Sequence, residues 1–155
     1  MNTKIAMLPK TPSFRLDGQS ALVTGASQGI GLGLAVALAE AGANVTMAAR
    51  SQKKLTKVAK QICDNGFKAS AIELDVTNID LVKQTINSNG PYQILVNNAG
   101  ANIPADLNDI TEKDYDFVTD LNVRSAIFVA QAVAAGLIDN KLSGSIINIS
   151  SQMGH

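Results

Sequence analysis

The feature that most constrains this chain is a glycine-rich turn between a predicted strand and a predicted helix. Residues 24–31 read TGASQGIG and follow the apolar residues 21–23. Gly25, Gly29 and Gly31 let the backbone approach a ligand closely, because no Cβ stands in the way. The helix behind the turn adds unpaired N–H groups and a partial positive charge. We therefore predict a binding site for the pyrophosphate of a dinucleotide, with a flexible loop between packed elements as the alternative.

The glycine spacing narrows the kind of phosphate site. The common G-x-G-x-x-G order is absent from the turn, and no G-K-[ST] follows at the distance that a P-loop needs. The turn therefore excludes a P-loop, and by itself it is only a moderate signal for a dinucleotide.

Length and composition favour one globular domain. The chain has 155 residues, 46% of them hydrophobic, and 13 Lys+Arg balance 13 Asp+Glu. Such a balance gives no indication of a nucleic-acid or anionic membrane partner. There is no run of 18 apolar residues, so no membrane-spanning helix is expected.

Cysteine and histidine are scarce. The single cysteine, Cys63, permits no intramolecular disulfide and suits a reducing cytoplasm, and we expect it to be a buried helix residue rather than a nucleophile. The single histidine is His155, so neither a histidine-based triad nor a metal site is expected.

Strand and helix patterns alternate along the chain. Strands are expected at 20–23, 44–49, 69–74, 93–96 and 145–149, and helices at 31–40, 52–64, 79–87 and 112–138. Short apolar strands joined by helices indicate a parallel sheet covered on both faces. Right-handed crossovers then give a doubly wound α/β fold of the Rossmann type. We expect residues 1–16 to form a flexible leader and residues 17–155 to form the dinucleotide-binding domain.

Polar residues gather where the predicted strands end. The glycine-rich turn, Arg50, Asp75, the run 97–100 and the pair 150–151 each follow a strand. Ligands of open α/β sheets bind beyond the carboxyl ends of the strands. This coincidence strengthens the prediction of a nucleotide site.

Together these motifs resemble the short-chain dehydrogenase/reductase family, in its common single-domain branch. The matching pieces are TGASQGIG at 24–31, Asp75-Val76, NNAG at 97–100, Asn122 and INISS at 147–151, in the family's order and approximate spacing. The resemblance runs from about Leu16 onward. It implies an oxidoreductase that moves a hydride between a nicotinamide cofactor and a ketone or secondary alcohol, and a homo-oligomer, dimer or tetramer, when complete.

The resemblance also implies the cofactor-binding residues. The amides of residues 27–30 would hold the pyrophosphate, Asp75 would accept a hydrogen bond from the adenine amino group, and the run 97–100 would let the nicotinamide ribose approach. The complete set is Gly25, Ser27, Gln28, Gly29, Ile30, Gly31, Arg50, Ser51, Asp75, Val76, Asn98, Ala99 and Gly100. A helix cap is the alternative role for Asp75.

Two catalytic residues are implied in the same way. Asn122 would bend its helix and hold a water of the proton relay, with plain solvent exposure as the alternative. Ser151 would donate a hydrogen bond to the substrate carbonyl and the developing alkoxide. Ser150 competes for that role, but the family places the serine second in such a pair. We expect Ser150 to support the end of the strand.

Arg50 bears on the choice of cofactor. It ends the second predicted strand, where an acid would accept from a ribose 2′-hydroxyl and an arginine suits a 2′-phosphate. No acid occurs at positions 48, 49 or 51. We therefore predict NADP(H) in preference to NAD(H). Gln28 weakens this prediction, since many NADP-using relatives carry a basic residue there. Arg50 stacked on the adenine would serve either cofactor.

The family's Tyr-x-x-x-Lys pair is missing. Four residues after Tyr92 is Val96, and four after Tyr115 is Thr119. We therefore expect an N-terminal portion of a larger enzyme, truncated after the first five strands and inactive alone; a natural short product is the alternative.

Two other functions stay open: a non-catalytic dinucleotide-binding module or sensor, and a flavodoxin-like or receiver-type module. Cut at this point, the helix 112–138 is expected to expose Ile127, Phe128, Val129 or Val133.

Overall fold

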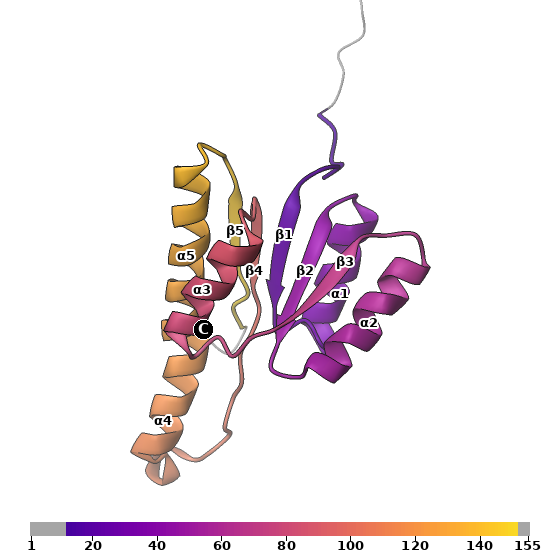
Figure 1. The fold of residues 1–155 in the computed structure, drawn as a ribbon. Coiled ribbons are helices and arrows are strands. Elements are labelled where there is room, and N and C mark those ends of the chain that lie inside the picture. The colour runs from indigo at the N-terminus through magenta and orange to yellow at the C-terminus, as the bar shows by residue number, and fades with distance from the viewer. Residues whose placement is uncertain (1–11, 152–155) are drawn as a thin grey trace, which may run out of the picture.

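A five-stranded parallel sheet with helices on both faces forms the centre of the molecule (Figure 1). The computed structural model describes residues 12–151. The strand order is β3-β2-β1-β4-β5, so strand addition reverses direction between β1 and β4. This confirms the predicted doubly wound sheet of the Rossmann type. The strands are β1 (Ser20–Thr24), β2 (Asn44–Ala49), β3 (Ala69–Glu73), β4 (Ile94–Asn97) and β5 (Ser145–Asn148).

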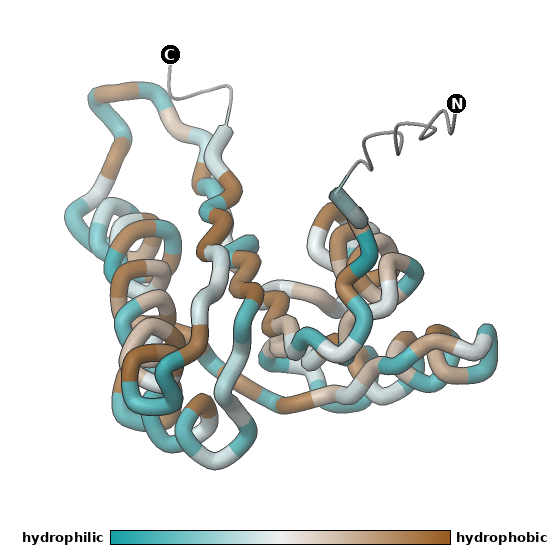
Figure 2. Tube along the Cα trace, turned by 90° about the horizontal axis from the view of Figure 1, so that it is seen from above, coloured by the Kyte–Doolittle hydropathy of each residue, from teal (hydrophilic) through white to brown (hydrophobic). Residues whose placement is uncertain are grey.

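The helices lie in two groups, one on each face of the sheet (Figure 2). Alternate residues of β1 point to opposite faces: Ala21 and Val23 belong to the core beneath α1 and α2, and Leu22 belongs to the core beneath α3 and α5. Both faces are thus buried, as a parallel sheet requires. The helices are α1 (Gly29–Glu40), α2 (Gln52–Asp64), α3 (Ile79–Asn89), α4 (Glu112–Thr119) and α5 (Ser125–Asp139), with a 3₁₀ turn at Leu107–Asp109.

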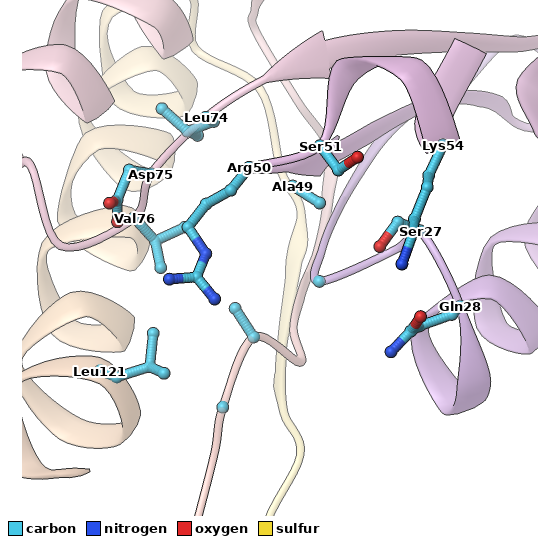
Figure 3. Close-up of a pocket in the computed structure, with 13 residues that line it drawn as sticks. Ser27, Gln28, Ala49, Arg50, Ser51, Lys54, Leu74, Asp75, Val76 and Leu121 are labelled. Carbon is cyan, nitrogen blue, oxygen red and sulfur yellow. The ribbon is translucent and has the colours of Figure 1, made fainter. Parts of the chain in front are cut away.

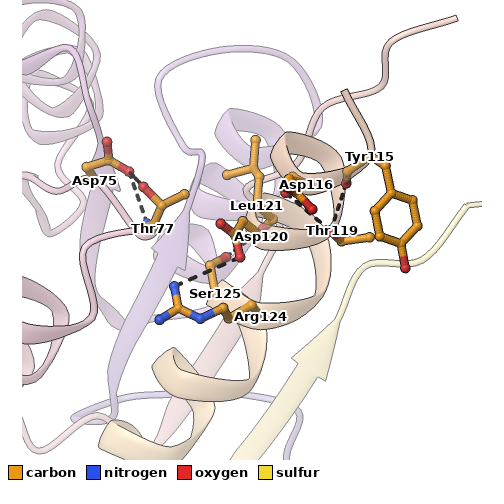
Figure 4. A network of polar contacts seen from close by, with 9 residues as sticks. All are labelled: Asp75, Thr77, Tyr115, Asp116, Thr119, Asp120, Leu121, Arg124 and Ser125. Atoms are coloured by element: carbon orange, nitrogen blue, oxygen red, sulfur yellow. Dashed lines mark hydrogen bonds and ion pairs between the residues drawn. The ribbon is translucent and has the colours of Figure 1, made fainter. Parts of the chain in front are cut away.

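The predicted helix 112–138 is interrupted. Between α4 and α5 lies a π-helical turn, Asp120–Arg124. Hydroxyls flank it: Thr119 donates to the carbonyl of Tyr115 at 2.7 Å, and Ser125 donates to that of Leu121 at 2.6 Å (Figure 4). Side-chain hydroxyls bonded to carbonyls one turn back are known to bend helices. The remaining elements begin and end within about two residues of the prediction, as is usual.

The expected exposure of this helix is only partly right. Ile127 is 59% exposed, but Val129 and Val133 are each 1% exposed and belong to the core beneath α3 and α5. They are buried because α3, which the prediction did not place there, packs against α5. Phe128 lies beneath Arg124, whose guanidinium carbon is 5.6 Å from the ring centroid.

Within residues 12–151, the stretch made of α4, the π-helical turn and α5 is long and apolar enough to cross a membrane by length and composition alone. It runs from Glu112 to Asp139, so the expectation that no such segment occurs does not hold by this measure. A core helix passes the same test, and the α5 part packs Val129, Val133 and Leu137 against the sheet and α3.

Two predictions concern residues outside the site, Cys63 and the N-terminal leader. The expected burial of Cys63 is wrong: the residue is exposed, and its thiol donates to the carbonyl of Ala69 at 3.2 Å. Ile62 faces the sheet, and the next residue is turned about 100° away from that face.

Residues 1–11 of the predicted leader lie outside the described residues, whereas the amide of Leu16 donates to the carbonyl of Ala41 at 2.9 Å. The leader boundary stays a prediction.

Candidate functional site

The glycine-rich turn is joined to the NNAG run through Thr24. The buried Thr24 hydroxyl accepts from the amides of Asn98 and Ala99, each at 3.0 Å. The Asn98 side chain donates back to the carbonyl of Thr24 at 3.0 Å and lies 3.4 Å from that of Gly25. Two motifs more than seventy residues apart therefore form one unit at the carboxyl ends of β1 and β4, where the strand order reverses and ligands of such sheets bind.

The three glycines of the turn have different roles. A Cβ on Gly25 would lie 2.9 Å from the Cα of Ala99, and a Cβ on Gly31 would collide with the carbonyl oxygen of Gly25. These two glycines are needed for packing within the unit. Gly29 has a φ of +57°, and no atom lies within 4 Å of the position that a Cβ would take there. Of the three, only Gly29 keeps an open approach, which is the role predicted for all of them.

The N-terminus of α1 is suited to an anion. The N-cap residue Gln28 makes no side-chain capping bond, and the first turn contains no acidic residue. The first amides of a helix have no intrahelical partner and carry a partial positive charge. Ile30 in this turn is 69% exposed. The amides of residues 27–30 are therefore placed where a phosphate can reach them.

A cavity of about 390 Å³ opens beside this turn (Figure 3). Nine of the predicted cofactor-binding residues line it: Gly25, Ser27, Gln28, Arg50, Ser51, Asp75, Val76, Ala99 and Gly100. Gly29, Ile30, Gly31 and Asn98 belong to the adjoining turn and its support and do not line it. The cavity thus brings the ends of β1, β2, β3 and β4 to one place.

Asp75 is held in a fixed orientation. Its Oδ1 accepts from the amide of Thr77 at 3.0 Å and from the hydroxyl of Thr77 at 2.7 Å (Figure 4). The helix-cap role belongs instead to Asn78, whose side chain accepts from the amide of Leu81 at 3.1 Å. Asp75 is therefore not the cap of α3, and it is one of the residues that line the cavity.

Arg50 and Lys54 place two cationic side chains on the cavity. Within residues 12–151 the ion pairs are Arg15 with Asp17, Lys60 with Asp64, and Arg124 with Asp120. Neither Arg50 nor Lys54 takes part in them. The same residues contain no group of three or more His, Cys, Asp or Glu placed to hold a metal. The site is therefore arranged to bind an anion through backbone amides and cationic side chains.

The geometry of the turn, the strand order and the cavity agree with one family. The family model described as short chain dehydrogenase matches residues 19–155. This chain belongs to the short-chain dehydrogenase family. Gluconate 5-dehydrogenase of Gluconobacter oxydans (strain 621H) is 42% identical over 142 residues, which cover 89% of this chain and 55% of that protein. L-xylulose reductase of Bos taurus is 36% identical over 138 residues, 89% of this chain and 55% of that protein.

A solved structure extends the likeness to three dimensions. Gluconate 5-dehydrogenase from Burkholderia cenocepacia J2315, in complex with NADP and tartrate, aligns with a TM-score of 0.85 at 40% identity. The alignment covers 90% of this chain and 56% of that one. This short-chain dehydrogenase chain therefore spans little more than half the length of the relatives that it matches.

The two predicted catalytic residues lie outside the cavity lining. Asn122 is in the π-helical turn, where its Oδ1 accepts from the amide of Ala101 at 2.9 Å and its Nδ2 donates to the carbonyl of Ala101 at 2.8 Å. It ties the turn to the segment after β4. Ser151 follows β5, whose pairing with β4 is extended by a bond from the amide of Ile149 to the carbonyl of Asn97 at 2.9 Å. Their catalytic roles stay predictions.

Several residues of the site were not predicted. Ala49, Lys54, Leu74 and Leu121 also line the cavity. Lys54 had a signal in the sequence, because it lies in the first turn of the predicted helix that follows Arg50, where side chains tilt back toward the helix N-terminus. Thr24 also had a signal in the sequence, because it is a polar residue at the end of an apolar strand. Leu74 and Leu121 reach the site only through the packing of distant elements, and no local pattern marks them.

Proposed function

We propose that this chain is the NADP(H)-binding part of an oxidoreductase that transfers a hydride between a nicotinamide cofactor and a ketone or secondary alcohol. The cavity carries the proposal: a glycine-rich turn and an uncapped helix N-terminus adjoin it, and the Arg50 side chain points into it (Figure 3). The bound NADP of the Burkholderia cenocepacia relative supports the choice of cofactor. When bound, the cofactor would supply or accept the hydride.

The chain's own residues fit such a ligand at four places. The amides of residues 27–30 would hold the pyrophosphate, and Gly29 leaves the approach open. The guanidinium of Arg50 would bind the 2′-phosphate with two donors. Asp75, held by Thr77, would accept from the adenine amino group. The run 97–100, fixed to Thr24, would present small residues to the nicotinamide ribose.

For the reaction we propose that Ser151 donates a hydrogen bond to the substrate carbonyl and to the oxygen on which negative charge develops. Asn122 would position groups of the proton relay through the π-helical turn. The sequence contains no Tyr-x-x-x-Lys pair. We therefore propose that the polypeptide of residues 1–155 binds the cofactor without turnover.

The names of the relatives support a polyol or a sugar acid as substrate. They include gluconate 5-dehydrogenase, galactitol 2-dehydrogenase and L-xylulose reductase. We propose a small hydroxylated carbonyl compound or the corresponding alcohol for this protein, and a homo-oligomer as the working assembly. The cytoplasmic location stays a prediction.

The proposal is tested by titrating the chain with NADPH and NADH and following the nicotinamide fluorescence. We expect NADPH to bind at least about tenfold more tightly. Arg50→Asp should remove that preference, because it replaces the phosphate-binding cation with a repelling anion. Lys57→Asp is the matched control, since Lys57 is exposed on α2 and does not line the cavity. Equal affinity for both cofactors in the unaltered chain would refute the preference.

A cofactor-binding module or sensor is the second candidate. It uses the same cavity and predicts NADPH binding without turnover. Assay of any longer natural form for oxidation of polyols and sugar acids separates the two functions. Turnover supports the enzyme, and tight NADPH binding with no turnover supports the module.

A further inference from the structure

We propose that Lys54 and the N-terminus of α2 complete the anion site that recognises the 2′-phosphate of NADP(H), so that Lys54 is a second specificity-determining residue beside Arg50. The inference rests on the proposed function, because it deepens the use of the same cavity. The sequence pointed to Arg50 and Ser51 alone at this place.

The N-terminus of α2 is left open to an anion. Ser51 is the N-cap of this 13-residue helix, but its side chain makes no capping bond, and the first turn contains no acidic residue. The first intrahelical bond of α2 runs from the amide of Leu55 to the carbonyl of Ser51 at 3.1 Å. The amides before Leu55 therefore have no intrahelical partner and point out of the helix end. An anion beside them would also gain from the helix dipole.

Lys54 is aimed at this helix end by the geometry of α2. Side chains of a helix tilt toward its N-terminus, so a long side chain in the first turn reaches back past the cap. Leu55, fully buried, fixes the rotation of the helix. Lys54 then lines the cavity with Arg50 and Ser27, whereas Lys53 does not. Figure 3 shows Lys54 reaching from α2 toward the glycine-rich turn and Arg50 pointing into the cavity.

The charges match a phosphate monoester. Arg50 and Lys54 contribute two positive charges to the cavity, and among the described lining residues Asp75 is the sole acid. A phosphate monoester carries about −1.5 to −2 charges at neutral pH. The pyrophosphate would bind at the separate N-terminus of α1. With NAD(H), which has no 2′-phosphate, the positive charges of Arg50 and Lys54 would therefore have no ligand charge to balance them. For NADP(H) they are balanced by the 2′-phosphate, and this difference gives specificity.

The experiment compares Lys54→Gln with Lys53→Gln in the full chain. Both substitutions remove one charge from the first turn of α2, but only Lys54 lines the cavity. Dissociation constants are measured for NADPH and NADH by fluorescence, and for 2′,5′-ADP and 5′-ADP by calorimetry. We expect Lys54→Gln to weaken NADPH and 2′,5′-ADP about tenfold, the loss of one charge-assisted hydrogen bond. NADH and 5′-ADP should change less than about twofold, and Lys54→Arg should keep the preference.

The outcomes separate this inference from the proposed function. If the unaltered chain prefers NADPH and Arg50→Asp removes the preference while Lys54→Gln keeps it, the role of Lys54 is overturned and the proposed function stands. An equal loss for NADPH and NADH, or the same loss in Lys53→Gln, also overturns it. If the unaltered chain binds neither nucleotide, both proposals fall. Thermal unfolding of each variant shows that the fold is retained.

Discussion

Thr24 shows how one residue can join two motifs. Its hydroxyl accepts two amide hydrogens from the NNAG run and lies 3.5 Å from the carbonyl of Val96. The residue is 1% exposed, so water cannot replace these bonds. The Thr24 hydroxyl and the Asn98 side chain together therefore fix the relative position of the glycine-rich turn and the end of β4.

Replacing that hydroxyl should loosen the unit. We expect Thr24→Val, which keeps the shape, to lower the free energy of unfolding by about 2 kcal/mol, because the amides of Asn98 and Ala99 lose a buried acceptor. Urea denaturation measures the change. Thr24→Ser keeps the hydroxyl and is the control. A Val variant as stable as the Ser variant would contradict the assigned role.

Tyr92 predicts a pH effect at the amino ends of the strands, opposite the candidate site. Its buried hydroxyl has no hydrogen-bond partner among the described residues, although Thr46 lies near enough to oppose part of the effect of burial. Burial raises the pKa of Tyr92. A raised pKa means that the folded state holds the proton more tightly. Stability from this group is therefore full below the unfolded pKa of about 10 and is lost as pH rises through the folded pKa.

We expect Tyr92→Phe to be as stable as the unaltered chain at pH 7, or more stable by up to about 1 kcal/mol, because it removes an unpaired buried hydroxyl. Above about pH 10 the unaltered chain should lose stability relative to the variant. Denaturant unfolding at neutral and alkaline pH gives both differences. A clear loss of stability in the Phe variant at pH 7 would show that the hydroxyl is satisfied.

At the scale of elements, α1 contains one glycine that packing requires and one that has open space around it. Gly31 packs against the carbonyl of Gly25, and Gly33, two residues later, has nothing within 4 Å of a Cβ position. Both have helical backbone, so intrinsic helix propensity favours alanine equally at the two positions. The packing of the turn on α1 makes the difference between them.

We expect Gly31→Ala to lower the free energy of unfolding by about 2 kcal/mol or more, since the turn must shift to admit the methyl group. Gly33→Ala should raise it by up to about 1 kcal/mol through helix propensity. Chemical denaturation of the two variants measures this contrast, and NADPH titration should show weakened binding for Gly31→Ala alone. Equal effects at both positions would remove the packing argument.

At the scale of the whole molecule, β5 is the most exposed strand. Ile146 and Ile147 point to opposite faces of the sheet, and both are more than 40% exposed. β5 pairs with β4 alone among the described strands. An apolar edge strand of this kind is a template for association.

We expect the polypeptide of residues 1–155 to bind the dye ANS and to self-associate as its concentration rises. Ile147→Thr, which keeps a β-branched side chain, should reduce both effects. Ile138→Thr changes a single exposed residue at the end of α5 and is the control. Dye fluorescence and sedimentation velocity report the outcome. A chain that stays monodisperse and does not bind the dye would contradict the prediction that exposed β5 drives association.

The alternation of apolar strands and helices was enough to predict the parallel sheet, its doubly wound order and most boundaries, because these depend on periodicity and local turn chemistry. Local patterns also predicted a site at Arg50 and Asp75, which line the cavity, and at the turn 24–31 beside it, since each directly follows a strand. The resemblance implied a bend of the helix at Asn122, but hydrophobic periodicity did not predict the π-helical turn found there, because the turn depends on hydroxyl-to-carbonyl bonds that compete with a regular helix over only a few residues.

By itself, then, the sequence determined the fold class and the family. It also predicted a phosphate site at the strand ends, because strand ends in a parallel sheet converge whatever packs around them. The tertiary structure alone decided which glycine is open to a ligand and that Thr24 joins the two motifs. It also decided that Val129 and Val133 are buried. The physical reason is that these properties depend on distances between segments far apart in the chain, which no local pattern records.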